Sequence, residues 1–151
     1  MIRFYRANEK PYGAFSNLYH RHMEFEGCRF PTAEHAYQYG KARSPEVREW
    51  LMSAPSPSLL AMAAHGLYSW DIAPGWSKNK VDRMKSVLLA KFSQFDDLRG
   101  LLLSTGAERL VEIGSVDNAV NRFWGMVDIK GTLTGKNMLG VLLREVREVL
   151  K

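Results

Sequence analysis

The sequence predicts a mainly helical α+β fold: a single compact domain over residues 1–151, with about six helices and a few short strands. Three observations lead to this prediction. A chain of 151 residues has the size of one domain and is long enough to bury a core. Its residues are 46% hydrophobic and 25% charged, as in soluble globular proteins. Helix-capping residues recur before runs with helical spacing of apolar side chains, whereas runs with strand alternation are short.

Short strands are expected in three places. Residues 2–5 alternate apolar and polar side chains, which is typical of a strand. Residues 23–30 indicate two short strands that turn at Glu26 and Gly27. Residues 109–113 indicate a further, buried strand.

Capping residues indicate where the helices start. Thr32 is a good N-cap for a first helix that runs to about residue 42, because its hydroxyl can accept from free backbone N–H groups of the first turn. Ser44 caps a second helix, with Pro45 at the first helical position. Caps and apolar stripes predict the others over residues 58–66, 77–92, 98–103 and 137–150. The segment 114–135 is expected to be an unusually long loop, and such loops are commonly functional.

Charge and cysteine content narrow the class of protein. The formal charge of +5 favours anionic partners such as phosphates, nucleotides or nucleic acid, although the excess is modest. Cys28 is the single cysteine, which excludes an internal disulfide and fits a reducing compartment. No signal-peptide pattern or membrane-length apolar run is present, so a cytoplasmic protein without a membrane partner is expected. Zinc-ligand spacings and dinucleotide-binding loops are absent, so neither a metal nor a cofactor is expected.

The first helix carries the most suggestive set of side chains. Glu34, Gln38 and Lys41 are spaced at i, i+4 and i+7, so a continuous helix would present a carboxylate, an amide and an amine from one stripe. Such a stripe suits chemistry on a polar small molecule. The alternative is an ordinary solvated helix face. The residues of this segment, taken alone, favour that alternative.

The long loop and the start of the last helix carry a second set. Asp117 and Trp124 could supply a charge and a stacking face for a planar base, or could be an Asx-turn and a core tryptophan. Lys136 and Asn137 stand at the start of the last helix, where free N–H groups and the helix dipole attract phosphate. The Walker A pattern is absent, so this is a weak phosphate signal.

Read in order, these motifs resemble the NADAR superfamily, the YbiA/RibX-like proteins. The matching segments span nearly the whole chain: residues 15–19, Gly27, residues 31–35 with Gln38 and Lys41, Trp76 with Met84, residues 91–92, residues 110–112, Asp117 with residues 124–125, and residues 135–140 with Arg147. The resemblance implies a mainly helical fold with a few short strands. It also implies an N-glycosidase that acts on phosphorylated ribosylamine intermediates of riboflavin synthesis or removes ADP-ribose from guanine bases.

The resemblance also assigns roles to residues. It implies catalytic roles for Glu34, Lys41 and Asp117. It implies substrate binding by Asn17, Gln38, Trp76, Trp124, Lys136 and Asn137.

Several alternatives stay open at this point. Glu34 and Asp117 can each stabilise a cation-like sugar or assist the attacking water. Lys41 either anchors an anionic group or attacks C1 of a ring-opened ribosylamine to give a Schiff base. The partner is a small phosphorylated ribosylamine or an ADP-ribosyl compound, with nucleic acid as an open choice of carrier for that substrate. The alternative function is a non-catalytic module that binds ADP-ribose or nucleic acid through positive charge and aromatic faces.

Overall fold

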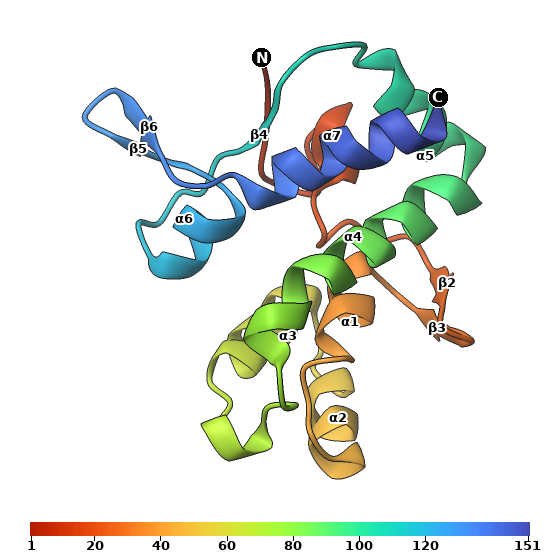
Figure 1. Cartoon of the computed structure of the whole chain (residues 1–151), viewed down its shortest axis with the longest axis vertical. Coiled ribbons are helices and arrows are strands. Elements are labelled where there is room, and N and C mark those ends of the chain that lie inside the picture. Colours follow the sequence, from red (N-terminus) through yellow and green to blue (C-terminus); the bar gives the residue numbers. More distant parts are fainter. The chain divides into compact units, whose positions relative to one another are not determined.

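The computed structural model describes residues 1–151 and confirms the predicted helix-rich α+β fold (Figure 1). The helices are α1 (Ala33–Gln38), α2 (Pro45–Met52), α3 (Pro57–His65), α4 (Trp76–Gln94), α5 (Asp96–Ser104), α6 (Ala119–Trp124) and α7 (Met138–Leu150), with short 3-10 helices at Tyr12–Phe15 and Ser69–Asp71. The strands are β1 (Ile2–Phe4), β2 (Met23–Phe25), β3 (Cys28–Phe30), β4 (Leu110–Glu112), β5 (Val127–Ile129) and β6 (Thr132–Thr134). No helix is both long and apolar enough to span a membrane.

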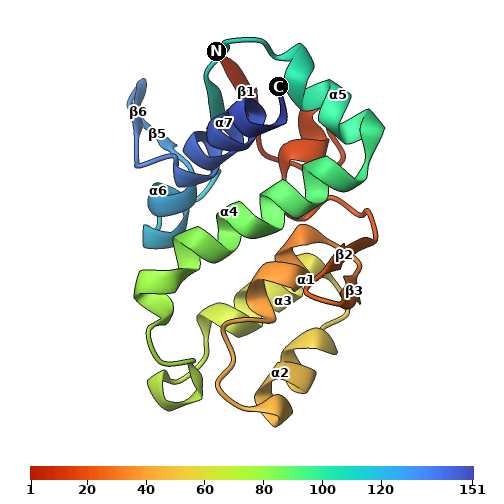
Figure 2. The ribbon, with the colours of Figure 1, turned by 45° about the vertical axis from the view of Figure 1, so that its right-hand side comes forward.

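Contacts within the chain define two compact units, and each is described by itself. The first unit comprises Met1–Tyr19 and Phe92–Lys151, and the second comprises His20–Lys91. Helix α4 is continuous in both ribbon views (Figure 2), and most of its residues belong to the second unit.

The first unit is built around the parallel pair of β1 and β4. Arg3 lies opposite Val111, and the side chains of Phe4 and Leu110 are almost completely buried. Helix α7 packs on β4. Gly140 allows this close approach, because a Cβ atom at this position would lie only 2.0 Å from the carbonyl oxygen of Leu110.

Asn137 ties the start of α7 to β4. Its backbone is left-handed, with φ of 51°, a conformation that asparagine tolerates better than most residues. Its side-chain Nδ2 donates to the carbonyl of Leu110 at 2.8 Å, and its Oδ1 accepts from the N–H of Glu112 at 3.1 Å. The side chain therefore replaces a neighbouring strand at the edge of β4.

The predicted long loop over residues 114–135 is wrong, because this segment folds into a helix and a hairpin. Asn118 is the N-cap of α6 and accepts from the N–H of Asn121 at 2.8 Å. Strands β5 and β6 pair through a two-residue turn at Lys130 and Gly131, which both have positive φ. These elements are only three to six residues long, too short for a periodic pattern to reveal them.

The second unit consists of the β2–β3 hairpin and four helices. The predicted turn at Glu26 and Gly27 is confirmed, and both residues have positive φ. Helices α2 and α3, with Ala42 from the segment between α1 and α2, form a small apolar core made by Ala42, Leu51, Leu60 and Ala64. Ser44 caps α2 as predicted, whereas α3 begins at Pro57 with Ser56 as its cap, slightly earlier than expected.

Helix α1 ends earlier than predicted. Its last residue is Gln38, and the N–H groups of Gly40 and Lys41 donate three residues back, to Tyr37 and Gln38. Lys41 therefore lies beyond the helix. The predicted stripe of Glu34, Gln38 and Lys41 is wrong for Lys41. Tight turns of this kind are common where an α-helix ends.

Arg83 of α4 closes the end of α1. Its Nη2 donates to the carbonyl of Ala36 at 2.6 Å, its Nε donates to the carbonyl of Tyr37 at 3.0 Å, and its Nη1 pairs with Glu26 at 2.7 Å. Helix-end carbonyls lack partners further along the helix, and here the Tyr37 carbonyl accepts from the N–H of Gly40 as well as from Arg83. Gly40 leaves room for the guanidinium, because a Cβ atom there would lie 2.3 Å from Nε of Arg83.

We expect Arg83→Met to lower the free energy of unfolding by about 3 kcal/mol, because two helix-end carbonyls lose a charged donor. The measurement is urea denaturation followed by circular dichroism. Arg29→Met, a change at an exposed position of β3, is the control and should leave the midpoint near that of the wild type. Equal midpoints for the two variants would contradict the role given to Arg83.

We expect Asn137→Ala to destabilise the protein by about 3 kcal/mol, because it leaves two backbone groups of β4 unpaired and puts alanine in a left-handed conformation. Thr132→Ala, on the exposed β5–β6 hairpin, is the control and should have a small effect. An Asn137→Ala protein as stable as this control would show that β4 does not need the asparagine amide.

Candidate active site

The buried pair of Glu34 and Gln38 is the centre of the candidate site. Thr32 caps α1 as predicted: its Oγ1 accepts from the N–H of His35 at 3.2 Å. From this start, the helix buries the side chains of both Glu34, which is 8% exposed, and Gln38, which is 2% exposed. Nε2 of Gln38 donates to Oε1 of Glu34 at 2.8 Å. The solvated-face interpretation is therefore wrong for these two residues.

Burial controls the protonation of Glu34. It raises the pKa of the Glu34 carboxyl, while the hydrogen bond from Gln38 and the charge of Lys41 lower this pKa to a smaller extent. The neighbouring phenol of Tyr37 stays neutral, because burial, and then the Glu34 charge, raises its pKa. A buried carboxyl with a raised pKa can hold a proton closer to neutral pH than an exposed one, which suits proton transfer.

Lys41 lies in a position that lowers the pKa of its amine. Nζ of Lys41 donates to the carbonyl of Ala64 at 2.7 Å, near the end of α3. Burial lowers the pKa of Lys41, and the charge of Lys80 lowers it further, against the opposing effect of Glu34. A lowered pKa is the condition that an amine nucleophile needs.

His65, Lys80 and Lys91 are titratable groups that sequence reasoning did not assign to the site. Partial burial, and then the Lys41 charge, lowers the pKa of His65. Complete burial lowers the pKa of Lys91 to about 7. No local motif distinguishes these residues, because their environments depend on segments distant in the sequence.

Two pairs of aromatic rings lie in the same unit as Lys41. The ring of Trp76 lies 5.1 Å from that of Tyr37, centroid to centroid, with an angle of 49° between the planes. Tyr68 and Trp70 stack at 4.6 Å and 10°, although they are 64% and 65% exposed. This exposed stack was not predicted. It leads into a segment joined to Lys41, whose carbonyl accepts from the N–H of Ala73 at 2.7 Å.

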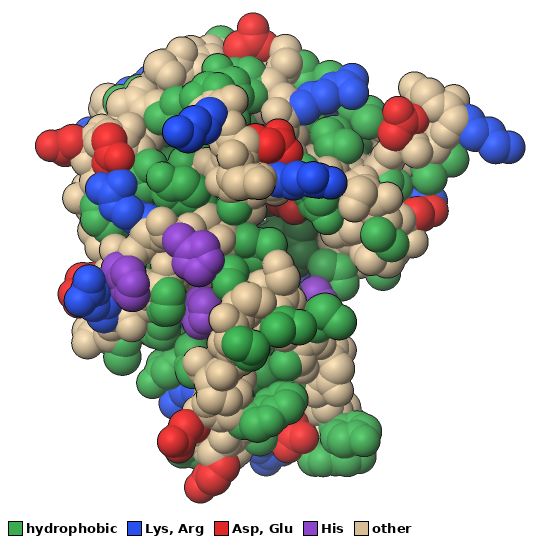
Figure 3. Space-filling view, turned by 180° about the vertical axis from the view of Figure 1, so that it is seen from behind, with side chains coloured by type: hydrophobic (Ala, Val, Ile, Leu, Met, Phe, Trp, Pro, Cys, Tyr) green, Lys and Arg blue, Asp and Glu red, His purple; other side chains and the backbone are tan.

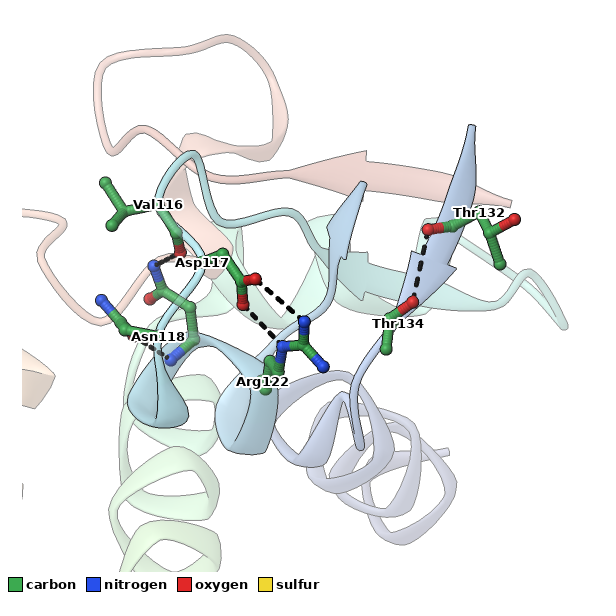
Figure 4. A network of polar contacts seen from close by, with 7 residues as sticks. Val116, Asp117, Asn118, Arg122, Thr132 and Thr134 are labelled. Atoms are coloured by element: carbon green, nitrogen blue, oxygen red, sulfur yellow. Dashed lines mark hydrogen bonds and ion pairs between the residues drawn. The ribbon is translucent and has the colours of Figure 1, made fainter. Parts of the chain in front are cut away.

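Asp117 lies in the first unit as half of an exposed ion pair (Figure 4). Its two carboxylate oxygens accept from Nε and Nη2 of Arg122 at 2.6 and 2.9 Å. The hydrogen bond from Arg122 is the main reason why the pKa of Asp117 is lowered. This carboxylate is therefore held in its ionised form.

The other expected binding residues of the first unit differ in how accessible they are. The rings of Trp124 and Phe123 meet edge to face at 4.8 Å, and Nζ of Lys136 lies 5.6 Å from the Phe123 centroid. Asn17 is buried at the end of the first 3-10 helix. The Asn137 amide is engaged with β4 on both its donor and its acceptor side, so its observed task is structural.

The structure brings together one part of the expected site. Glu34, Gln38, Lys41 and Trp76 belong to the second unit, where charge interactions connect Glu34 with Lys41. The remaining expected residues belong to the first unit: Asn17, Asp117, Trp124, Lys136 and Asn137. Their convergence with Glu34 and Lys41 stays a prediction.

Histidines gather on one face of the molecule (Figure 3). His20 and His22 are exposed, and their charges add to burial in lowering the pKa of His35. Nδ1 of His35 lies 2.7 Å from Oγ1 of Thr32. No group of three His, Cys, Asp or Glu side chains is arranged to hold a metal ion.

Comparisons with known proteins agree on one family. Residues 3–151 match the NADAR domain. N-glycosidase YbiA of Escherichia coli (strain K12) is 35% identical over 99% of this chain and 88% of its own length. The NMR structure of E. coli YbiA superposes with a TM-score of 0.83 at 36% identity, over 99% of this chain and 83% of that one.

Two further relatives differ in length. N-glycosidase Npun_R5314 of Nostoc punctiforme is 32% identical over 99% of this chain and 92% of its own length. Riboflavin biosynthesis protein VVA0006 of Vibrio vulnificus is 29% identical over 99% of this chain but only 38% of its own length. The chain belongs to the NADAR family, whose N-glycosidases hydrolyse N-glycosyl bonds.

Proposed function

We propose that this chain hydrolyses the C1–N bond of a phosphorylated ribosylamine, of the kind that riboflavin biosynthesis produces, or of an ADP-ribosyl-guanine adduct. The observation that carries the proposal is the buried Glu34–Gln38 pair together with the Lys41 amine, whose pKa is lowered, within the same unit. The relative named for riboflavin biosynthesis supports the first substrate class. The proposal includes the cytoplasmic location expected from the sequence.

Lys41 acts as the nucleophile in this proposal. The neutral Nζ adds its lone pair to C1 of the ring-opened ribosylamine, and the C1–N bond to the base then breaks. The departing base takes up a proton, and C1 is left as a Schiff base with Lys41. Water adds to C1, the bond to Nζ breaks, and the sugar phosphate leaves as the free aldehyde. An anion anchor would gain from a raised lysine pKa, so the lowered pKa favours the nucleophile role.

Glu34 moves the protons in this proposal. In its protonated form it gives a proton to the departing nitrogen, and as a carboxylate it then accepts one from the attacking water. Its raised pKa supports both halves of this cycle near neutral pH. Asp117, which its ion pair keeps ionised, is proposed as the second carboxylate that stabilises positive charge at C1.

Aromatic and polar residues are proposed to bind the substrate. Trp76 and Trp124 provide flat faces for the base. Lys136 supplies a positive charge for the phosphate. Gln38 and Asn17 are proposed to make polar contacts with the substrate. Asn137 is the least suited of these residues to bind substrate, because its amide is already hydrogen-bonded to β4.

We expect the purified protein to release sugar phosphate from an aminopyrimidine ribosylamine phosphate, or ADP-ribose from ADP-ribosylated guanine. Mass spectrometry of the products, with each probe in a separate reaction, decides between the substrates. Guanine is presented both as a free nucleotide and within single-stranded DNA, which tests nucleic acid as the carrier. Binding that weakens with salt but gives no product would instead support the non-catalytic alternative.

Lys41→Ala and Lys41→Arg should both abolish product formation, because neither side chain can form the Schiff base. The anion-anchor alternative predicts that Lys41→Arg keeps substantial activity. Lys78→Ala, at an exposed position of α4, is the control and should react normally. Borohydride should attach the sugar to a wild-type peptide that contains Lys41. Attachment at the buried Lys91 would contradict the assignment.

A further inference from the structure

Gln38 makes its hydrogen bond to Glu34 from the next turn of the same helix. The bond runs from Nε2 to Oε1 of Glu34 at 2.8 Å. Its direction matters, because the amide offers a donor to the carboxylate and so stabilises the ionised form. It also holds one carboxylate oxygen in place and leaves the other one unconstrained by Gln38.

The remaining polar atom of Gln38 argues against a purely structural role. Its Oε1 is buried and has no hydrogen-bond partner. Nearly all buried polar atoms in proteins have a partner, and a buried acceptor without one is destabilising. An apolar side chain of similar size at this 2% exposed position would avoid that cost. Within the protein, the amide is used in the contact with Glu34.

We propose that Gln38 is a positioning residue: its amide holds the Glu34 carboxyl in the orientation in which this group acts in turn as acid and base. The inference rests on the proposed function for its catalytic consequence. It extends that function, because it gives Gln38 an effect on the chemistry that acts through Glu34.

Other charged groups around α1 also influence the protonation of Glu34. Lys41 lowers the proton affinity of Glu34, and the carboxylate in turn affects Tyr37. The titratable or charged residues of the surrounding elements include His35 and Tyr37 on α1, Arg29 on β3, His65 at the end of α3, and, on α4, Lys78, Lys80, Asp82, Arg83, Lys85 and Lys91. None of them is changed by a substitution of Gln38, so an effect on Glu34 can be assigned to the amide.

The test compares Gln38→Met with the wild type. Methionine keeps the length of the side chain and removes the donor. A ¹³C NMR titration of the Glu34 carboxyl, assigned with Glu34→Gln, should show a midpoint about one pH unit higher in the variant. Tyr39→Phe, which removes one hydroxyl next to Gln38 in the sequence, is the matched control and should leave the midpoint unchanged.

The kinetic test uses the pH profile of kcat/KM with the aminopyrimidine ribosylamine phosphate. The limb that depends on Glu34 should move to higher pH by the same amount as the NMR midpoint, and kcat should fall about tenfold or more. The melting temperature below the Glu34 midpoint should not fall, because the carboxyl is then protonated and the variant removes an acceptor that has no partner. Above the midpoint it should fall, because the carboxylate has lost its donor. Should Gln38→Met fail to fold, Gln38→Leu serves instead, since it also lacks both N–H donors and adds no charge.

The outcomes separate this inference from the proposed function. An unchanged Glu34 titration in Gln38→Met would overturn the inference, whatever the activity. A lower melting temperature with no movement of the pH limb would also overturn it and indicate a structural role. A shifted titration in a protein that cleaves neither probe would refute the proposed function while it supports the coupling of Gln38 to Glu34.

Discussion

The second unit depends on keeping a carboxyl group buried on a helix of only six residues. A short helix has little stability of its own, and most of its backbone groups lie in its first or last turn. Thr32 satisfies a donor at one end, and Arg83 covers two carbonyls at the other. Burying the Glu34 carboxyl is unfavourable compared with leaving it in water. The capping contacts therefore stabilise the helix that keeps this carboxyl buried.

Burial and nearby charges set the electrostatics of the site. Burial favours the neutral forms of Glu34 and Lys41, while their mutual attraction favours the charged forms. Burial is the larger effect at both residues, so the pKa of each group lies nearer to neutral pH than it would in water. Proton transfer and attack by an amine require this condition.

Sequence patterns predicted the parts of the fold that rest on local chemistry. Ser44 before Pro45 located α2, and the apolar spacing of α7 located the last helix. The sequence patterns failed where contacts between distant segments determine where an element ends. The end of α1 is fixed by Arg83, 46 residues from Tyr37 in the sequence, and no pattern within the helix could reveal this contact.

In the candidate site, too, local spacing was predicted correctly and features that depend on tertiary contacts were not. The spacing of Glu34 and Gln38 correctly placed them one turn apart, but their burial depends on the elements packed around α1. The Asp117–Arg122 pair lies within six consecutive residues, yet the long-loop prediction hid the helix that brings the two side chains together. The Asn137 amide bonds to residues about 25 positions earlier, so its structural task could not be read from its place before α7.

Gly40 links the backbone of this region to its chemistry. Any side chain at this position would meet the guanidinium of Arg83, which is free to move only by giving up the carbonyls of Ala36 and Tyr37. A methyl group there would thus loosen the helix that carries Glu34 without touching Glu34 itself. Among natural variants of this chain, larger residues at position 40 should therefore occur together with a shorter or uncharged residue at position 83.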